Sequence, residues 1–118
     1  MAIKTNKESV VPTDEGFLTV WRFLRADEAS IDYGASTGLV IYGAPDSDSM
    51  PQMGSAHDLP EFHYVLSGRG FLLDEGELIE LEAGDALVIE PGRRHAMWGQ
   101  ADDPLVAFYV ALHSPVVG

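Results

Sequence analysis

The chain contains no cysteine among its 118 residues. This absence excludes disulfide bonds, thiolate nucleophiles and cysteine metal ligands. Proteins of oxidising compartments commonly carry disulfides, so the composition favours a reducing location and we expect a cytoplasmic protein. Long apolar runs are missing too. No window approaches the roughly 18 apolar residues that a membrane span needs, and the first residues lack a signal-peptide pattern, so we expect no membrane partner.

Positive charge is scarce. Seven lysines and arginines stand against 19 acidic residues, for a net charge of −12, and the only lysines are Lys4 and Lys7. A field of this sign repels phosphate backbones and anionic headgroups, which argues against nucleic acid and membrane surfaces as partners. The ordinary consequence of such acidity is solubility, and we adopt that interpretation.

Helical periodicity is also missing. Short β-branched and aromatic runs recur instead, with turns about every eight to twelve residues, which is typical of an antiparallel sandwich or barrel. The expected strands are residues 17–24, 39–42, 61–66, 71–73, 78–81, 86–90, 95–98 and 105–112. A chain of this length predicts one domain, which we place at residues 17–118. Residues 1–16 form a polar arm that can add an edge strand through Val10 and Val11.

Residues 43–54 form a loop by composition, near the upper end of ordinary loop lengths. Loops of this kind are often lids or binding segments. Met50 and Met53 either line a pocket, because thioethers fill irregular apolar gaps, or pack beneath a solvent loop. Both alternatives stay open.

Three of the four histidines lie in two short stretches, residues 55–70 and 84–95. The first stretch leads into an apolar run, and the second is an apolar strand that turns at Pro-Gly and ends in a histidine. Together they supply the candidate ligands His57, Glu61, His63 and His95. That concentration indicates one site, a metal site, built from two strands that lie side by side. The fourth histidine, His113, is expected at the surface.

Residues alternate faces along a strand, so Glu61, His63 and Val65 share one face. An isolated carboxylate on a buried face costs several kcal/mol. A divalent metal removes that cost, because it binds a carboxylate and neutral imidazoles and leaves positions open for a substrate. Two histidines and one carboxylate are also the ligand set of non-haem iron(II) oxygenases.

The spacing His57-x3-Glu61-x6-Gly68, followed by Gly84-x7-Gly92-x2-His95, resembles the two motifs of the cupin superfamily. Those motifs run Gly-x5-His-x-His-x3,4-Glu-x6-Gly and then Gly-x5-Pro-x-Gly-x2-His-x3-Asn. The match covers residues 54–99, and its short spacer resembles that of small single-domain bacterial cupins. The resemblance implies an all-β jelly-roll barrel, with His57, Glu61 and His95 as ligands of one divalent ion: iron, zinc, nickel or manganese.

The first motif departs from the family pattern. Ser55 stands where the first histidine is expected, and Ser49 stands at the leading glycine. In the second motif, Glu90 replaces the proline and Gly99 replaces the closing asparagine. A serine hydroxyl is a weak ligand beside an imidazole, so three of the usual four ligands remain.

His63 offers a compensation, as a fourth ligand or as a general acid or base beside the metal, because histidine titrates near neutral pH. The alternative is a core histidine bonded to Glu61 or Tyr64. Further candidates for the substrate pocket are Tyr42, Met53, Ser55, Arg94 and Met97. We expect Met97 to face inward after His95, whereas the facing of Tyr42 is not readable from the sequence.

These features predict a metal-dependent cupin enzyme that acts on a small organic substrate. The metal serves as a Lewis acid or as an oxygen-activating centre, in dioxygenase, isomerase, cyclase or lyase chemistry. The alternative is a non-catalytic small-molecule-binding or sensor cupin whose metal site has decayed. Small cupins commonly pair through N-terminal strands, so the resemblance also implies a homodimer, for which residues 17–24 are sufficiently apolar.

Overall fold

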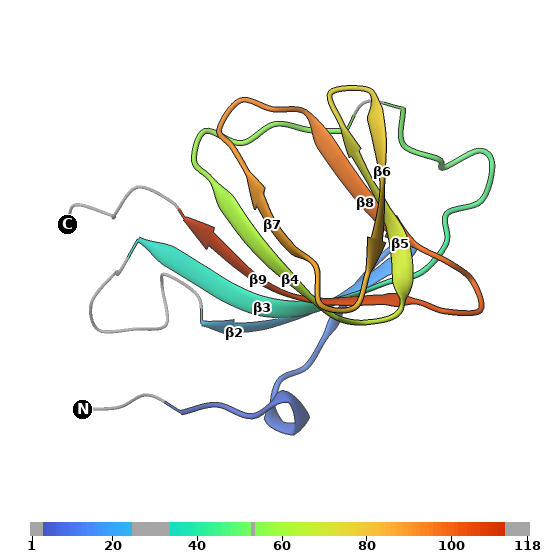
Figure 1. The fold of residues 1–118 in the computed structure, drawn as a ribbon. Helices are drawn as coiled ribbons and strands as arrows, with labels where there is room; N and C mark the ends of the chain where they lie inside the picture. Colours follow the sequence, from blue (N-terminus) through green and yellow to red (C-terminus); the bar gives the residue numbers. More distant parts are fainter. Residues whose placement is uncertain (1–3, 25–33, 53, 113–118) are drawn as a thin grey trace.

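The computed structural model describes residues 4–24, 34–52 and 54–112 (Figure 1). Within these ranges, nine strands form two antiparallel sheets. The larger sheet has the order β1-β2-β3-β9-β4-β7, and the smaller has the order β6-β5-β8. Within the described ranges, no helix is long and apolar enough to cross a membrane. The described residues form an all-β jelly-roll barrel, as the sequence predicts.

The elements begin with a short 3-10 helix, η1 (Lys7–Ser9), which the Asn6 side chain caps by accepting a hydrogen bond from Glu8 N–H at 2.9 Å. The larger sheet consists of β1 (Thr13–Glu15), β2 (Leu18–Leu24), β3 (Ala35–Tyr42), β4 (Glu61–Ser67), β7 (Ala86–Ile89) and β9 (Leu105–Leu112). The smaller sheet consists of β5 (Arg69–Asp74), β6 (Glu77–Glu82) and β8 (His95–Gly99).

The two sheets enclose one core. Apolar side chains from both contribute to it, because successive side chains of a strand point to opposite faces of the sheet. From the larger sheet come Val20, Val40, Tyr42, Val65, Ile89, Leu105 and Ala107, and from the smaller come Leu72, Leu81 and Met97. Val65 and Leu105 are fully buried. The core therefore joins strands that are far apart in the sequence, such as β3 and β9.

Two local predictions need correction. The edge strand of the N-terminal arm lies at Thr13–Glu15 rather than at Val10 and Val11, and Val11 is 89% exposed. The reason is a tight turn at Gly16, which folds Thr13–Glu15 back onto β2. Strand β3 begins at Ala35, earlier than predicted, because its small residues pair with β9 although their own strand propensity is low.

Candidate metal centre

Three candidate ligands meet where the two sheets come together. Glu61 opens β4 in the larger sheet, and His95 opens β8 in the smaller one. His57 lies in the loop before β4, and its carbonyl accepts a hydrogen bond from Gly92 N–H at 2.8 Å. Ser55 and His95 exchange two backbone hydrogen bonds, at 3.0 and 2.9 Å, so the loop is fixed to the start of β8.

The donor atoms of these residues converge. Nε2 of His57 lies 3.1 Å from Oε2 of Glu61, and Nε2 of His95 lies 3.3 Å from the same oxygen. Two ligands bound at 2.0–2.2 Å to one ion, about 90–110° apart, are separated by about 2.8–3.6 Å. Oε2 of Glu61 is buried and has no hydrogen bond of good geometry. The distances from Glu61 Oε2 to the two imidazole nitrogens are thus those expected of ligands that share one divalent ion.

The electrostatics prepare Glu61 to bind a cation. Burial by itself raises the pKa of the carboxyl group, but the imidazoles of His63, His95 and His57 outweigh burial and hold that pKa well below its usual range. The carboxylate is therefore ionised at neutral pH. Contact with Glu61 in turn raises the pKa of His95, against the opposing effect of burial. A metal ion that binds here therefore competes with a proton for His95.

A second layer of contacts orients His95. Its Nδ1 lies 3.2 Å from the carbonyl oxygen of Arg93, so Nδ1 carries the hydrogen and Nε2 presents its lone pair to the site. The Arg93 guanidinium donates two hydrogen bonds to Asp74, at 2.9 and 3.1 Å. Arg94 N–H donates to the Glu75 carboxylate at 2.9 Å. The β5–β6 hairpin thereby fixes the turn that delivers His95.

His63 lies deeper in the barrel than the three donors. Its side chain is 5% exposed, and its Nε2 is 3.6 Å from Oε1 of Glu61, too far for a hydrogen bond. Both ring nitrogens are buried without a hydrogen-bond partner. The ring lies 6.2 Å from that of Tyr109. A buried imidazole without partners is costly, so this residue is suited to a group that enters the pocket.

The donors open onto a pocket of about 520 Å³ between the sheets. Tyr42, Ser55 and Met97, three of the predicted pocket residues, line it with the four candidate site residues. Burial, and secondly the charge of Glu61, raises the pKa of Tyr42, so its hydroxyl stays protonated. Arg94 is exposed and is not part of the lining. Met53 and His113 lie outside the described residues.

The sequence did not point to the outer wall of this pocket. Glu15, Phe17 and Leu18 line it because Leu18 pairs with Tyr42 in the sheet. Pro51 and Gly54 contribute from the loop before β4. Glu15, Phe17 and Leu18 lie outside both motifs, and the pairing of β2 with β3 brings them to the site.

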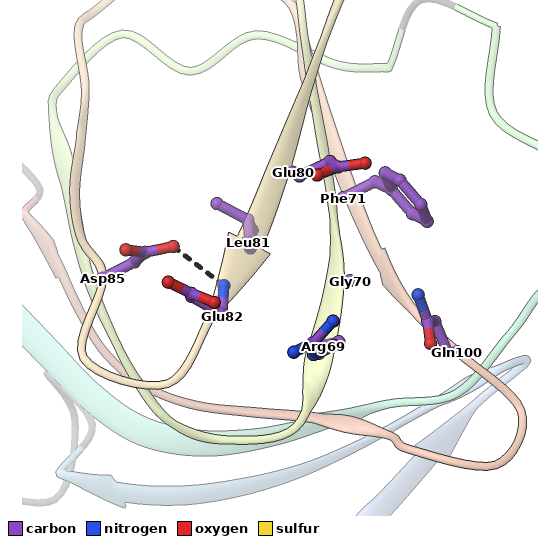
Figure 2. Close-up of a pocket in the computed structure, with 8 residues that line it drawn as sticks. All are labelled: Arg69, Gly70, Phe71, Glu80, Leu81, Glu82, Asp85 and Gln100. Atoms are coloured by element: carbon purple, nitrogen blue, oxygen red, sulfur yellow. Dashed lines mark hydrogen bonds between the residues drawn. The ribbon is translucent and has the colours of Figure 1, made fainter.

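A second pocket, of about 340 Å³, lies elsewhere in the molecule (Figure 2). Arg69 lies in it among three carboxylates, those of Glu80, Glu82 and Asp85, and Asp85 accepts a hydrogen bond from Glu82 N–H at 2.8 Å. Its lining includes no histidine. The histidines at the candidate metal centre line the first pocket and not this one.

Solved structures share the fold. Hydroxypropylphosphonic acid epoxidase from S. wedmorenis aligns with a TM-score of 0.76 at 15% identity, over 94% of this chain and 59% of that chain. The chain thus spans little more than half of the epoxidase. A predicted oxalate decarboxylase from Thermotoga maritima aligns with a TM-score of 0.73 at 14% identity, over 95% of this chain and all of that chain (100%). Identities this low show the fold alone.

A cupin protein from Bacteroides fragilis is more similar in sequence, at 26% identity, with a TM-score of 0.62 over 82% of this chain and 80% of that chain. No curated protein matches the sequence. The model of the cupin domain family matches residues 44–111, which hold His57, Glu61, His63 and His95. This match covers more than half of the chain, and the protein therefore belongs to the cupin family.

Proposed function

We propose that the protein is a metal-dependent enzyme that acts on a small organic substrate in the pocket between the two sheets. The observation that carries this proposal is the convergence of His57, Glu61 and His95 on one point, with an ionised and otherwise unsatisfied carboxylate at its centre. The iron(II) form of the structurally similar epoxidase, itself a much longer chain, is consistent with such chemistry on this fold.

The chain's own residues have distinct roles in this proposal. His57, Glu61 and His95 hold the ion, which supplies a Lewis acid or an oxygen-activating centre when bound. Phe17, Leu18, Tyr42 and Met97 form the walls that orient the substrate and exclude water. His63 holds or moves a proton at its Nε2, because it is buried beside Glu61 and its ring nitrogens have no hydrogen-bond partner.

The ligand set favours iron(II) over zinc, nickel and manganese, because two histidines and one carboxylate with open positions are typical of non-haem iron oxygenases. Dioxygenase-type chemistry is therefore our first candidate. Isomerase, cyclase or lyase chemistry follows if the bound ion is redox-inactive.

Elemental analysis of untagged protein, purified without added metal, tests the proposal. We expect about one equivalent of a divalent metal. Glu61→Ala should lose it, whereas Glu77→Ala, an exposed carboxylate on the β5–β6 hairpin, should keep it. Iron would direct a substrate screen under air towards catechols, thiols and diketones. No metal in the purified protein, and none taken up on addition, would refute the proposal.

The same measurement on His63→Gln separates the two roles of that residue. A full equivalent of metal in this variant supports proton transfer, and loss of the metal makes His63 a fourth ligand. Proton transfer further predicts that the variant changes the pH profile of any turnover found in the screen.

One observation favours the second candidate, a non-catalytic small-molecule-binding or sensor cupin. Ser55 reaches the pocket where the family motif has a histidine, and His57 is 53% exposed, so the metal is held by three ligands of which one is accessible. This function predicts that ligands bind the His57→Ala variant as tightly as they bind the wild type. For either candidate we propose a cytoplasmic location, in keeping with the absence of cysteine.

A further inference from the structure

Glu15 brings a carboxylate to the rim of the pocket at the candidate metal centre. It ends β1, where the sheet register places it opposite Leu18, and Leu18 lies opposite Tyr42. Residues directly opposite one another in adjacent antiparallel strands have their side chains on the same face of the sheet. Glu15, Leu18 and Tyr42 thus form one row across three strands, and all three line the pocket. Because the Glu15 side chain is 44% exposed, it lies at the solvent end of this row.

The described part of the chain supplies no lysine or arginine to the lining of this pocket. The guanidinium of Arg22 contacts the Glu15 carboxylate at 3.1 Å, but Arg22 lines a separate surface groove with Val11 and Phe23. Its positive charge is therefore already paired. Arg25 lies outside the described residues, and the other cations lie away from the lining, at Lys4, Lys7, Arg69, Arg93 and Arg94.

The interior of the pocket combines apolar walls with hydrogen-bonding groups. Phe17, Leu18 and Met97 supply the walls. At the deep end, both ring nitrogens of His63 are buried without a hydrogen-bond partner, and the Tyr42 hydroxyl is protonated and able to donate. An imidazole and a hydroxyl are suited to a hydroxyl or carbonyl oxygen of a ligand.

The charge of Glu15 acts inside the pocket as well as at its rim. Burial, followed by electrostatic interaction with Glu61, Tyr109 and Glu15, raises the pKa of Tyr42. A carboxylate that opposes ionisation of the Tyr42 hydroxyl also opposes the entry of an anionic ligand beside it. The net charge of −12 on the chain acts in the same direction, because it repels anions from the whole surface.

We propose that Glu15 determines specificity at this site, which takes an uncharged organic substrate with a hydroxyl or carbonyl group on an apolar frame. The inference rests on the proposed function and names its substrate class. A bound ion compensates the charge of the substrate atom that it holds. A carboxylate or phosphate elsewhere on the substrate would instead face Glu15 and apolar walls, and an anion taken into such surroundings without a partner is strongly disfavoured.

Calorimetric titration with two probes of nearly equal shape tests the proposal. Protocatechuate is a catechol with one carboxylate, and protocatechuamide is its uncharged amide; both carry the same pair of hydroxyls. On the zinc-loaded protein, and again on the metal-free protein, we expect the amide to bind about tenfold or more tightly than the acid. Zinc is redox-inactive, so neither probe is oxidised by the ion.

Two variants then assign this preference to Glu15. Glu15→Gln removes the carboxylate and releases Arg22, so affinity for the acid should rise roughly three- to tenfold while affinity for the amide stays unchanged. Arg22→Gln leaves the Glu15 charge unpaired and should weaken binding of the acid further. The Glu15–Arg22 pair is exposed on both sides and contributes little to stability, so both variants should fold, as circular dichroism can verify.

The matched control is Asp14→Asn. Asp14 precedes Glu15 in β1, is also exposed, and accepts a hydrogen bond from the Thr19 hydroxyl at 3.0 Å, but it does not line the pocket. The control changes the net charge by the same amount as Glu15→Gln and should keep the wild-type ratio of affinities. Equal or tighter binding of the acid by the wild type overturns the proposal, as does failure of the amide to bind. A control that narrows the ratio as much as Glu15→Gln also overturns it.

Failure of the proposed function has a different signature. It appears as a protein without metal in the elemental analysis, whatever the two probes do. The titrations of the metal-free protein then still decide whether Glu15 selects against anions, because Glu15 does not belong to the candidate ligand set.

Discussion

Gly54 holds the loop of His57 against the strand of His95, and a single methyl group there should disturb the metal centre. Its φ is +80°, and a Cβ added to it would collide with the backbone carbonyl of His95. The carbonyl carbon and oxygen of His95 are backbone atoms, so they cannot move aside as the end of a flexible side chain would. The neighbouring residue, Ser55, is bonded to His95 by both of its backbone groups. Gly54→Ala must therefore open this bridge or shift His95.

The magnitude follows from two costs. Holding alanine at a positive φ costs about 1–3 kcal/mol. Opening the Ser55–His95 bridge removes two hydrogen bonds, which contribute about 0.5–1.5 kcal/mol each. The sum is about 2–6 kcal/mol. Displacement of His95 should also weaken metal binding by about ten- to hundredfold, the range seen when the groups that orient a ligand are lost.

Gly76→Ala is the matched control. Gly76 has a φ of +85°, almost that of Gly54, but a Cβ there would meet nothing within 4 Å. In both variants backbone strain lowers the free energy of unfolding, and the loss of flexibility in the unfolded chain raises it by the same amount. Only in Gly54→Ala does the collision also open the Ser55–His95 bridge, so the free energies of unfolding of the two variants should differ by about 1–3 kcal/mol.

Thermal unfolding of the metal-free proteins measures the stability difference, and competition with a chromogenic chelator measures the metal affinity. For a chain of this size, 1 kcal/mol shifts Tm by roughly 4 °C, so we expect Gly54→Ala to melt about 4–12 °C below Gly76→Ala. Equal melting temperatures together with equal metal affinities would refute the reasoning, because the collision would then have no consequence.

Three further predictions concern the pH dependence of metal binding, the residues that orient His95, and the core. Metal affinity should fall by about tenfold per pH unit as His95 protonates, and the fall should begin above the ordinary histidine pKa because that of His95 is raised. A metal titration from about pH 8 to 5 checks this, and a pH-independent affinity contradicts it. Asp74→Asn should weaken metal binding about tenfold without loss of fold, because it loosens Arg93, whose carbonyl orients His95. Chelator competition measures the metal affinity, and an unchanged affinity would show that Asp74 does not help to orient His95. Leu105→Ala in the core should lower the free energy of unfolding by about 2–5 kcal/mol, whereas Leu78→Ala at the surface should change it by no more than about 0.5 kcal/mol. Urea unfolding measures both, and similar losses would contradict the described packing.

Much of the site follows from local patterns in the sequence. The spacing of His57, Glu61 and His95 resembles a family motif, and the structure brings these three residues together. Alternation along β4 correctly places His63 on the inner face and Tyr64 on the outer one. Alternation after His95 likewise predicts that Met97 faces inward, and Met97 lines the pocket. Such features are readable because a strand repeats every two residues, whatever it pairs with.

Other features of the site depend on pairing between distant segments. Tyr42 reaches the pocket because β3 lies between β2 and β9, and no local pattern states its facing. The walls at Glu15 and Phe17 come from a hairpin that precedes the first motif by some forty residues. Arg94, a predicted pocket residue, is exposed because its backbone is bonded to Glu75 on the β5–β6 hairpin.

The two faces of β4 show the same division. The sequence by itself determines that Phe62, Tyr64 and Leu66 alternate with inward residues, since the chain can turn only every second side chain to one side. Only the tertiary structure decides that Phe108 and Val88 lie beside them, because strand register is set by the packing of the whole sheet. Local periodicity thus determined which residues of β4 face the pocket, and long-range pairing decided what surrounds them.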